Sequence, residues 1–174
     1  MTRGPEEISF GAADAITAVR IVLSMALLFC TAFSPAFYTL YVVAGLTDMA
    51  DGAVARRTGT ASDFGARLDS AADFAFVAAC LVKLLPELAI PAWLWVWTAV
   101  IALAKAVNLV SGYVMQRRLV ALHTAMNKAA GALLFLLPLT LPFVALKYTA
   151  PVVCAVATFA AVQEGHLIRT GRGD

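Results

Sequence analysis

The sequence predicts an all-α integral membrane protein with six transmembrane helices. Of its 174 residues, 61% are hydrophobic and 14% are charged, whereas a soluble domain averages about 45–50% apolar and about 25% charged residues. The chain also contains several runs of about 20 mostly apolar residues, the length that a helix needs to cross a bilayer. No linker or low-complexity tract divides it, so we expect a single domain over residues 1–174.

Six segments are long and apolar enough to be the expected helices. They are Ile16–Ser34, Ala36–Arg56, Phe64–Leu84, Ile90–Val114, Thr124–Val144 and Tyr148–Ile168. Ser34-Pro35 predicts a tight break between the first two segments, and Pro86 and Pro91 bracket the turn between the third and the fourth. Pro138 and Pro142 are expected to kink the fifth helix, because proline cannot donate a helical hydrogen bond.

The distribution of basic residues predicts the orientation of these helices. If both termini are cytoplasmic, ten of the 13 Lys and Arg residues fall on the cytoplasmic side. Only Lys83 and Lys147 fall on the other side, while Lys105 lies within the fourth segment. Since cytoplasmic loops carry an excess of Lys and Arg, we expect both termini in the cytoplasm.

Other features describe the surroundings of the helices. The stretch from Pro5 to Ala15 could form a short helix in the membrane interface. Three tryptophans near the outer end of the fourth segment are expected to be an interfacial anchor: Trp93, Trp95 and Trp97. The net charge of only +2 gives no reason to expect a nucleic-acid partner.

Eight residues form two stripes on the second and third segments. The first stripe consists of Asp48, Asp51, Gly52, Ala55 and Arg56, at positions i, i+3, i+4, i+7 and i+8. The second consists of Gly65, Asp69 and Asp73, at positions i, i+4 and i+8. Residues with this spacing share one face of a helix. A short connection predicts that the two helices are antiparallel neighbours, so the four carboxylates should face one another near the cytoplasmic surface.

Four carboxylates at membrane depth indicate a functional site, because ionisable groups there are rare and face a bundle interior or a wet cavity. Crowded carboxylates repel one another, so either some are protonated or cations neutralise them. Oxygen ligands of this kind suit Mg²⁺ or Mn²⁺, and four could hold two ions. Paired metals about 3.5–4 Å apart are a recurring device for displacement at phosphorus. Arg56 could bind a phosphate through two hydrogen bonds.

The two stripes together resemble the signature of the CDP-alcohol phosphatidyltransferase family, and they match each of its eight fixed positions. The resemblance implies transfer of a phosphatidyl group from a CDP-linked lipid such as CDP-diacylglycerol to a polar alcohol, with release of CMP, in phospholipid biosynthesis. Thr17 and Arg20 resemble a weaker family feature at the start of the first segment. Asp14 stands where many members carry Asn, which leaves the role of that position open.

The resemblance also implies roles for the residues of the signature. Two Mg²⁺ or Mn²⁺ ions would be held by Asp48, Asp51, Asp69 and Asp73. Asp73 would in addition take the proton from the attacking hydroxyl as the catalytic base. The CDP-lipid would be bound by Gly52, Ala55, Arg56, Gly65 and Thr17. Family members also lead us to expect a homodimer in a bacterial cell membrane, with its active site facing the cytoplasm.

The acceptor alcohol is expected to be bound by basic residues outside the signature. The candidates are Lys105, Arg117, Arg118 and Lys128. A basic cavity favours glycerol 3-phosphate or an inositol phosphate, and serine or inositol are alternatives that need fewer charges. Arg117 and Arg118 are better interpreted as topology charges. The Gly-Lys and Lys-Thr patterns associated with glycerophosphate-using members are absent, and the polar cluster His123–Lys128 occupies that region.

The sequence disfavours two other classes of function. A transporter with an acidic cavity would predict inverted repeats or broken helices, and the sequence contains no internal repeat. A prenyl-diphosphate enzyme would carry Asp pairs at different separations, without the accompanying Gly, Ala and Arg. The complete spacing match therefore favours a phosphatidyltransferase.

Overall fold

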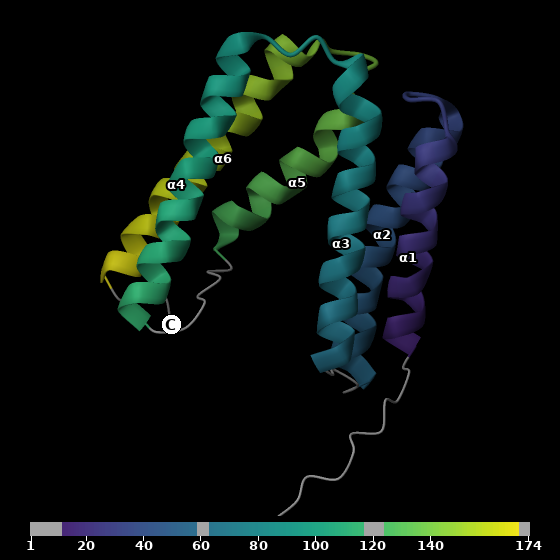
Figure 1. Ribbon diagram of the computed structural model, residues 1–174, viewed down its shortest axis with the longest axis horizontal. Coiled ribbons are helices and arrows are strands. Elements are labelled where there is room, and N and C mark those ends of the chain that lie inside the picture. Colours follow the sequence, from purple (N-terminus) through teal and green to yellow (C-terminus); the bar gives the residue numbers. More distant parts are fainter. Residues whose placement is uncertain (1–11, 59–62, 117–123, 171–174) are drawn as a thin grey trace, which may run out of the picture. The chain divides into compact units, whose positions relative to one another are not determined.

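The computed structural model describes residues 12–58, 63–116 and 124–170. Within these ranges every regular element is a helix, which confirms the all-α prediction for this part of the chain (Figure 1). The elements are α1 (Ala12–Phe29), α2 (Pro35–Thr58), α3 (Asp63–Leu84), the short 3₁₀ helix η1 (Leu85–Glu87), α4 (Ala92–Gln116), α5 (Ala125–Thr140) and α6 (Leu146–Thr170).

The first helix ends earlier than the apolar run suggests. The sequence predicts it to continue to Ser34, but α1 ends at Phe29, and Phe33 adopts a left-handed backbone with φ of 60°. The Ser34 hydroxyl then accepts a hydrogen bond of 3.1 Å from the amide of Phe37, which caps the start of α2. Pro35 follows as the first residue of α2, where its missing N–H is of no consequence. The predicted break at Ser34-Pro35 is therefore confirmed.

The fifth helix is shorter than predicted. Pro138 lies near the end of α5, and the amide of Leu141 donates to the Pro138 carbonyl as the helix terminates after Thr140. Pro142 lies beyond this end. The predicted end at Val144 is therefore wrong, while the expected kink at Pro138, which lies inside α5, remains a prediction. At the other end, Thr124 caps α5 by accepting a bond of 3.1 Å from the amide of Asn127.

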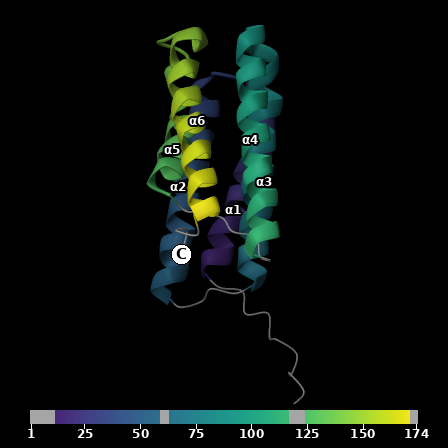
Figure 2. The same cartoon turned by 90° about the vertical axis from the view of Figure 1, so that its left-hand side faces the viewer.

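The chain divides into two compact units, Met1–Leu88 and Ala89–Asp174, and each is described by itself. In the first unit α1 packs against both α2 and α3 (Figures 1 and 2). The sequence predicts α2 and α3 as direct neighbours, whereas the main packing partner of each is α1. The expected single domain over residues 1–174 remains a prediction.

Aromatic side chains fill the core of the first unit. Phe37 is fully buried and stacks on Tyr41, with ring centroids 6.0 Å apart. Tyr41 in turn contacts Phe76 of α3 at 5.3 Å between centroids. Leu27 of α1 is also fully buried. Aromatic contacts thus join α2 to α3, and α1 packs against both helices.

In the second unit α6 packs against both α4 and α5. Its core contains Leu94, Ala150 and Cys154. The indole N–H of Trp97 donates to the hydroxyl of Thr158 at 3.0 Å, which joins α4 to α6. Trp97 therefore has a packing role inside the unit, while the expected interfacial anchoring of the three tryptophans remains a prediction.

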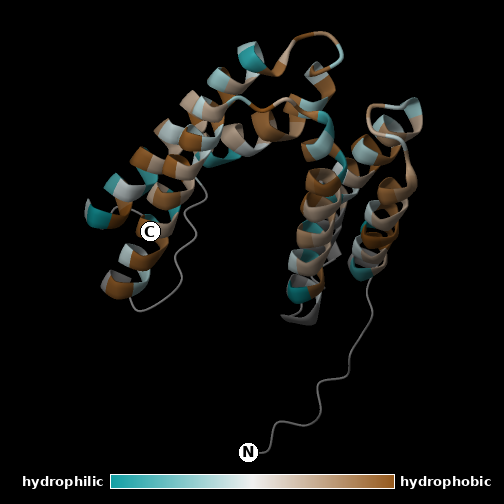
Figure 3. Ribbon diagram, turned by 45° about the horizontal axis from the view of Figure 1, so that its top comes forward, coloured by the Kyte–Doolittle hydropathy of each residue, from teal (hydrophilic) through white to brown (hydrophobic). Residues whose placement is uncertain are grey.

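Much of the apolar surface of these helices is exposed. On α4, six exposed aliphatic residues recur at intervals of three or four positions, with exposed fractions between 45% and 69%. They are Val96, Val100, Leu103, Val107, Val110 and Val114. Figure 3 shows apolar residues along the lengths of the helices. Among the described residues, Ala92–Val114 and Leu146–Thr170 are long and apolar enough to cross a membrane, and Ala125–Thr140 is a shorter apolar helix. The count of six spans remains a prediction.

Candidate functional site

Three of the four predicted aspartates come together in the first unit. Asp48 projects from α2, and Asp69 and Asp73 lie one turn apart on α3. One carboxylate oxygen from each lies within 4.8 Å of the others, a grouping that could hold a metal ion. The predicted facing of the two acidic stripes is confirmed for these three residues.

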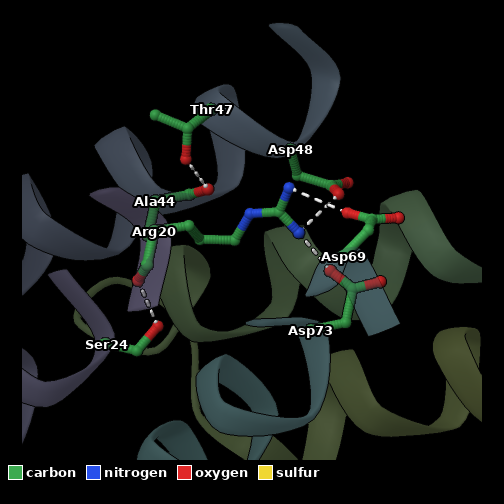
Figure 4. Close-up of polar contacts among 7 residues, drawn as sticks. All are labelled: Arg20, Ser24, Ala44, Thr47, Asp48, Asp69 and Asp73. Atoms are coloured by element: carbon green, nitrogen blue, oxygen red, sulfur yellow. Dashed lines mark hydrogen bonds and ion pairs between the residues drawn. The ribbon is translucent and has the colours of Figure 1, made fainter. Parts of the chain in front are cut away.

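A single arginine from α1 lies between these carboxylates (Figure 4). Arg20 Nη1 lies 2.9 Å from Asp48 Oδ1 and also donates to Asp73 Oδ1. Its Nη2 donates to Asp69 Oδ1 at 3.1 Å. One guanidinium therefore binds carboxylates from two helices, and each of these charge-assisted bonds is stronger than a neutral one.

Burial differs sharply between the two sides of this cluster. Arg20 is fully buried, whereas the side chains of Asp48, Asp69 and Asp73 are 51%, 46% and 55% exposed. The arginine thus supports the carboxylates from inside the unit, and they can be reached from outside. Burying a charge is costly unless it is paired, so the three aspartates allow Arg20 to be placed there.

Small residues beside the cluster explain how α1, α2 and α3 approach closely enough for Arg20 to reach the three carboxylates. Ala44 lies one turn before Asp48 on α2, and Ala72 directly precedes Asp73 on α3; both are fully buried. Small residues at helix interfaces let backbones approach. On α1 the hydroxyl of Ser24 donates to the backbone carbonyl of Arg20 at 2.7 Å, so it is satisfied within its own helix.

The remaining predicted residues of the signature are placed less completely. Asp51, Gly52, Ala55 and Arg56 belong to α2, but their side chains lie outside the described part of the structure. Gly65 is half-buried near the start of α3. Thr17 is buried on α1, three residues before Arg20. The predicted CDP-lipid site therefore keeps its status as a prediction.

From the sequence, Arg20 is predicted only as part of a weaker family feature. The pattern that could have revealed it is a polar stripe on an otherwise apolar helix. Asp14, Thr17, Arg20 and Ser24 follow one another at intervals of three or four residues, and all four are buried. Buried polar side chains at this spacing indicate that one face of α1 meets polar partners.

A second polar cluster lies in the other unit and includes a predicted acceptor residue. The ammonium of Lys105 on α4 lies 2.6 Å from Glu164 Oε2 on α6. It also donates to Asn127 Oδ1 on α5 at 2.7 Å, and Asn127 Nδ2 donates to Glu164 Oε2 at 3.4 Å. Nearby, Asn108 Nδ2 donates to the carbonyl of Ala161 at 2.7 Å. These bonds join all three helices of the unit.

The other acceptor candidates are not part of this cluster as described. Lys128 is exposed in the first turn of α5. Arg117 and Arg118 lie outside the described residues. Of the four predicted acceptor residues, the structure therefore describes Lys105 and Lys128.

The fold and the site together define a class, that of helical proteins with a carboxylate cluster able to hold a divalent cation. The family model for CDP-alcohol phosphatidyltransferases matches residues 10–163 of the chain. The chain belongs to this family, as the sequence motif predicts. Searches of curated proteins and of solved structures gave no match.

Family membership fixes the coarse activity. Members are integral membrane transferases that move a phosphatidyl group from a CDP-alcohol to an alcohol acceptor, and they depend on divalent metal ions. The residues present fit such an ion, because three half-exposed carboxylates offer the hard oxygen ligands that Mg²⁺ and Mn²⁺ prefer. The family match also disfavours the transporter alternative.

Proposed function

We propose that the protein transfers a phosphatidyl group from CDP-diacylglycerol to a small polar alcohol and releases CMP. The observation that carries this proposal is the convergence of Asp48, Asp69 and Asp73 from two helices, in a chain of this family. Together with Asp51, these residues would hold two Mg²⁺ or Mn²⁺ ions. Bound divalent ions supply charge neutralisation at the diphosphate and make CMP a better leaving group.

The protein's own residues would perform the remaining steps. Asp73 accepts the proton of the acceptor hydroxyl, whose oxygen then forms a bond to the β-phosphorus of the CDP-lipid. The bond from that phosphorus to the oxygen of CMP breaks, and CMP leaves with the electron pair. More than half of the Asp73 side chain is exposed, which supports access for a hydroxyl.

Binding of the donor is assigned to residues around this cluster. Arg56 would hold the diphosphate, while Thr17 and the small residues Gly52, Ala55 and Gly65 would line the nucleotide site. We propose that the lipid tails remain in the bilayer, which explains why the carboxylates belong to a bundle with an apolar exterior. The site is proposed to face the cytoplasm of a bacterial cell, in a homodimer of six-span subunits.

The acceptor is proposed to be bound by Lys105, Lys128, Arg117 and Arg118. Glycerol 3-phosphate or an inositol phosphate is favoured by these charges, with serine or inositol as the alternatives. Glu164 lies 2.6 Å from Lys105 and offsets its charge, which leaves the exposed Lys128 as the stronger attraction for a phosphate.

The test is release of CMP by the purified full-length protein in lipid nanodiscs. CDP-diacylglycerol is supplied with Mg²⁺ or Mn²⁺ and with each acceptor in turn. Asp69→Asn and Asp73→Asn should lower the rate by about 10²-fold or more, since each removes a metal ligand and the second also removes the base. Glu87→Gln is the matched control, because Glu87 is an exposed carboxylate of the same unit outside the signature. No CMP release with any acceptor would refute the proposed function.

A further inference from the structure

We propose that Arg20 is an internal competitor for the divalent metal, so that it lowers the metal affinity of the carboxylate cluster. The inference rests on the proposed metal site, but it concerns binding and not the transfer reaction. Its basis is that one buried guanidinium binds the same three carboxylates that would coordinate the ion.

The geometry makes Arg20 and a metal ion compete for the same carboxylates. The guanidinium of Arg20 contacts the Oδ1 atom of each of Asp48, Asp69 and Asp73. The carboxylate oxygens lie within 4.8 Å of one another, and Mg²⁺ binds oxygen at about 2.0–2.1 Å. An ion bound centrally by all three Oδ1 atoms would occupy the place of the guanidinium nitrogens. For such an ion to bind, the carboxylates must turn away from Arg20 or Arg20 must release them.

Electrostatics act in the same direction as geometry. The guanidinium remains protonated at all working pH values, so it repels an incoming cation. Arg20 is fully buried, so water screens its charge only weakly. The half-exposed carboxylates are reached by a metal from outside and by Arg20 from inside. Because the form engaged by Arg20 does not bind the ion at those atoms, the apparent affinity is reduced by the share of protein in that form.

An opposite role can be stated from the same contacts. Arg20 could orient the carboxylates for the metal, as hydrogen-bonding partners of metal ligands commonly do, and its removal would then weaken binding about 10–100-fold. The two roles predict opposite signs for one measurement. We favour competition because Arg20 binds all three ligands at once and carries the same sign of charge as the metal.

The experiment is a Mn²⁺ titration of the full-length protein in nanodiscs without any lipid substrate, with free Mn²⁺ measured by electron paramagnetic resonance. Arg20→Gln should tighten Mn²⁺ binding about tenfold or more. Arg20→Lys keeps a buried cation but loses the planar fork, so its affinity should lie between those of the wild type and Arg20→Gln. Ser24→Ala is the matched control, since Ser24 is buried on the same helix and bonds only the Arg20 backbone in this cluster; its affinity should stay unchanged.

A second measurement follows the melting temperature with and without Mn²⁺. The ion should raise it more in Arg20→Gln than in the wild type, because the variant leaves the three carboxylates without their internal cation. Should Arg20→Gln fail to fold, Arg20→Lys decides the question by the direction of its change. Equal or weaker Mn²⁺ binding in the folded Arg20 variants overturns the inference. Absence of Mn²⁺ binding in both the wild type and folded Arg20→Gln would instead refute the proposed metal site.

Discussion

Lys105 and Glu164, which form an ion pair in the second unit, should be energetically coupled. A double-mutant cycle can measure this coupling. Lys105→Met leaves the Glu164 carboxylate, which is 13% exposed, with Asn127 as its remaining partner in this cluster. Glu164→Leu leaves the Lys105 side chain, which is 39% exposed, with Asn127 and with access to solvent. The double variant removes both charges and should be less destabilised than the two single changes added together.

The magnitude follows from burial. Breaking a dry ion pair by removing one partner costs about 3–5 kcal/mol, whereas an exposed pair contributes about 0–1 kcal/mol. This pair is intermediate, so Lys105→Met should lower the free energy of unfolding by about 2 kcal/mol. Glu164→Leu should lower it by about 1 kcal/mol, because Lys105 can extend its ammonium toward water. We expect a coupling energy of about 1–2 kcal/mol. This is above the average coupling energy of about 0.6 kcal/mol for hydrogen bonds between membrane helices.

The assay is reversible unfolding in mixed micelles, followed by circular dichroism for the four proteins of the cycle. Coupling below about 0.5 kcal/mol would refute the argument, since independent sites add within that range. The same variants test acceptor binding by Lys105. If Lys105 binds the acceptor, the double variant should recover stability while its KM for the acceptor remains raised.

Two further predictions concern glycine packing and metal removal. Gly165→Ala should lower the free energy of unfolding by about 1 kcal/mol, because the new Cβ would lie 2.6 Å from Asn108 Oδ1 and disturb a buried hydrogen bond. Gly131→Ala meets nothing within 4 Å and should raise stability by about 0.5–1 kcal/mol; equal melting temperatures for the two variants would contradict this. Treatment with EDTA should abolish CMP release, and Mg²⁺ or Mn²⁺ should restore it. Full activity after complete removal of metal would exclude the proposed metal chemistry.

The positions of most helices could be predicted from the sequence because apolar runs and prolines mark them clearly. The predicted Phe64–Leu84 differs from α3 by one residue at its start, and Ala36–Arg56 differs from α2 by one and two residues. The prediction for α1 ends five residues too late, at Ser34 and not at Phe29. Hydropathy cannot detect a turn made of apolar residues, and the left-handed backbone at Phe33 lies within such a stretch.

The carboxylate cluster was predictable in part, and its limit is physical. The spacing of Asp69 and Asp73 places both on one face of α3, and their approach to Asp48 is confirmed. Helical periodicity carries no information about which distant side chain enters such a cluster. Arg20 is 49 and 53 residues away from these aspartates in sequence, and its position follows from the packing of α1 against α2 and α3.

The placement of Arg20 creates opposing demands on one residue. Without an internal cation, the repulsion among Asp48, Asp69 and Asp73 would separate α2 from α3, because an unpaired charge cluster in a helical bundle is destabilising. With Arg20 engaged, the same carboxylates are less available to the metal that the family needs for catalysis. Functional sites commonly trade stability against activity. Because Arg20→Gln removes the internal cation, it should lower the stability of the protein and leave the carboxylates more available to the metal. The loss of stability in that variant should therefore be largest without metal and should diminish as Mn²⁺ is added.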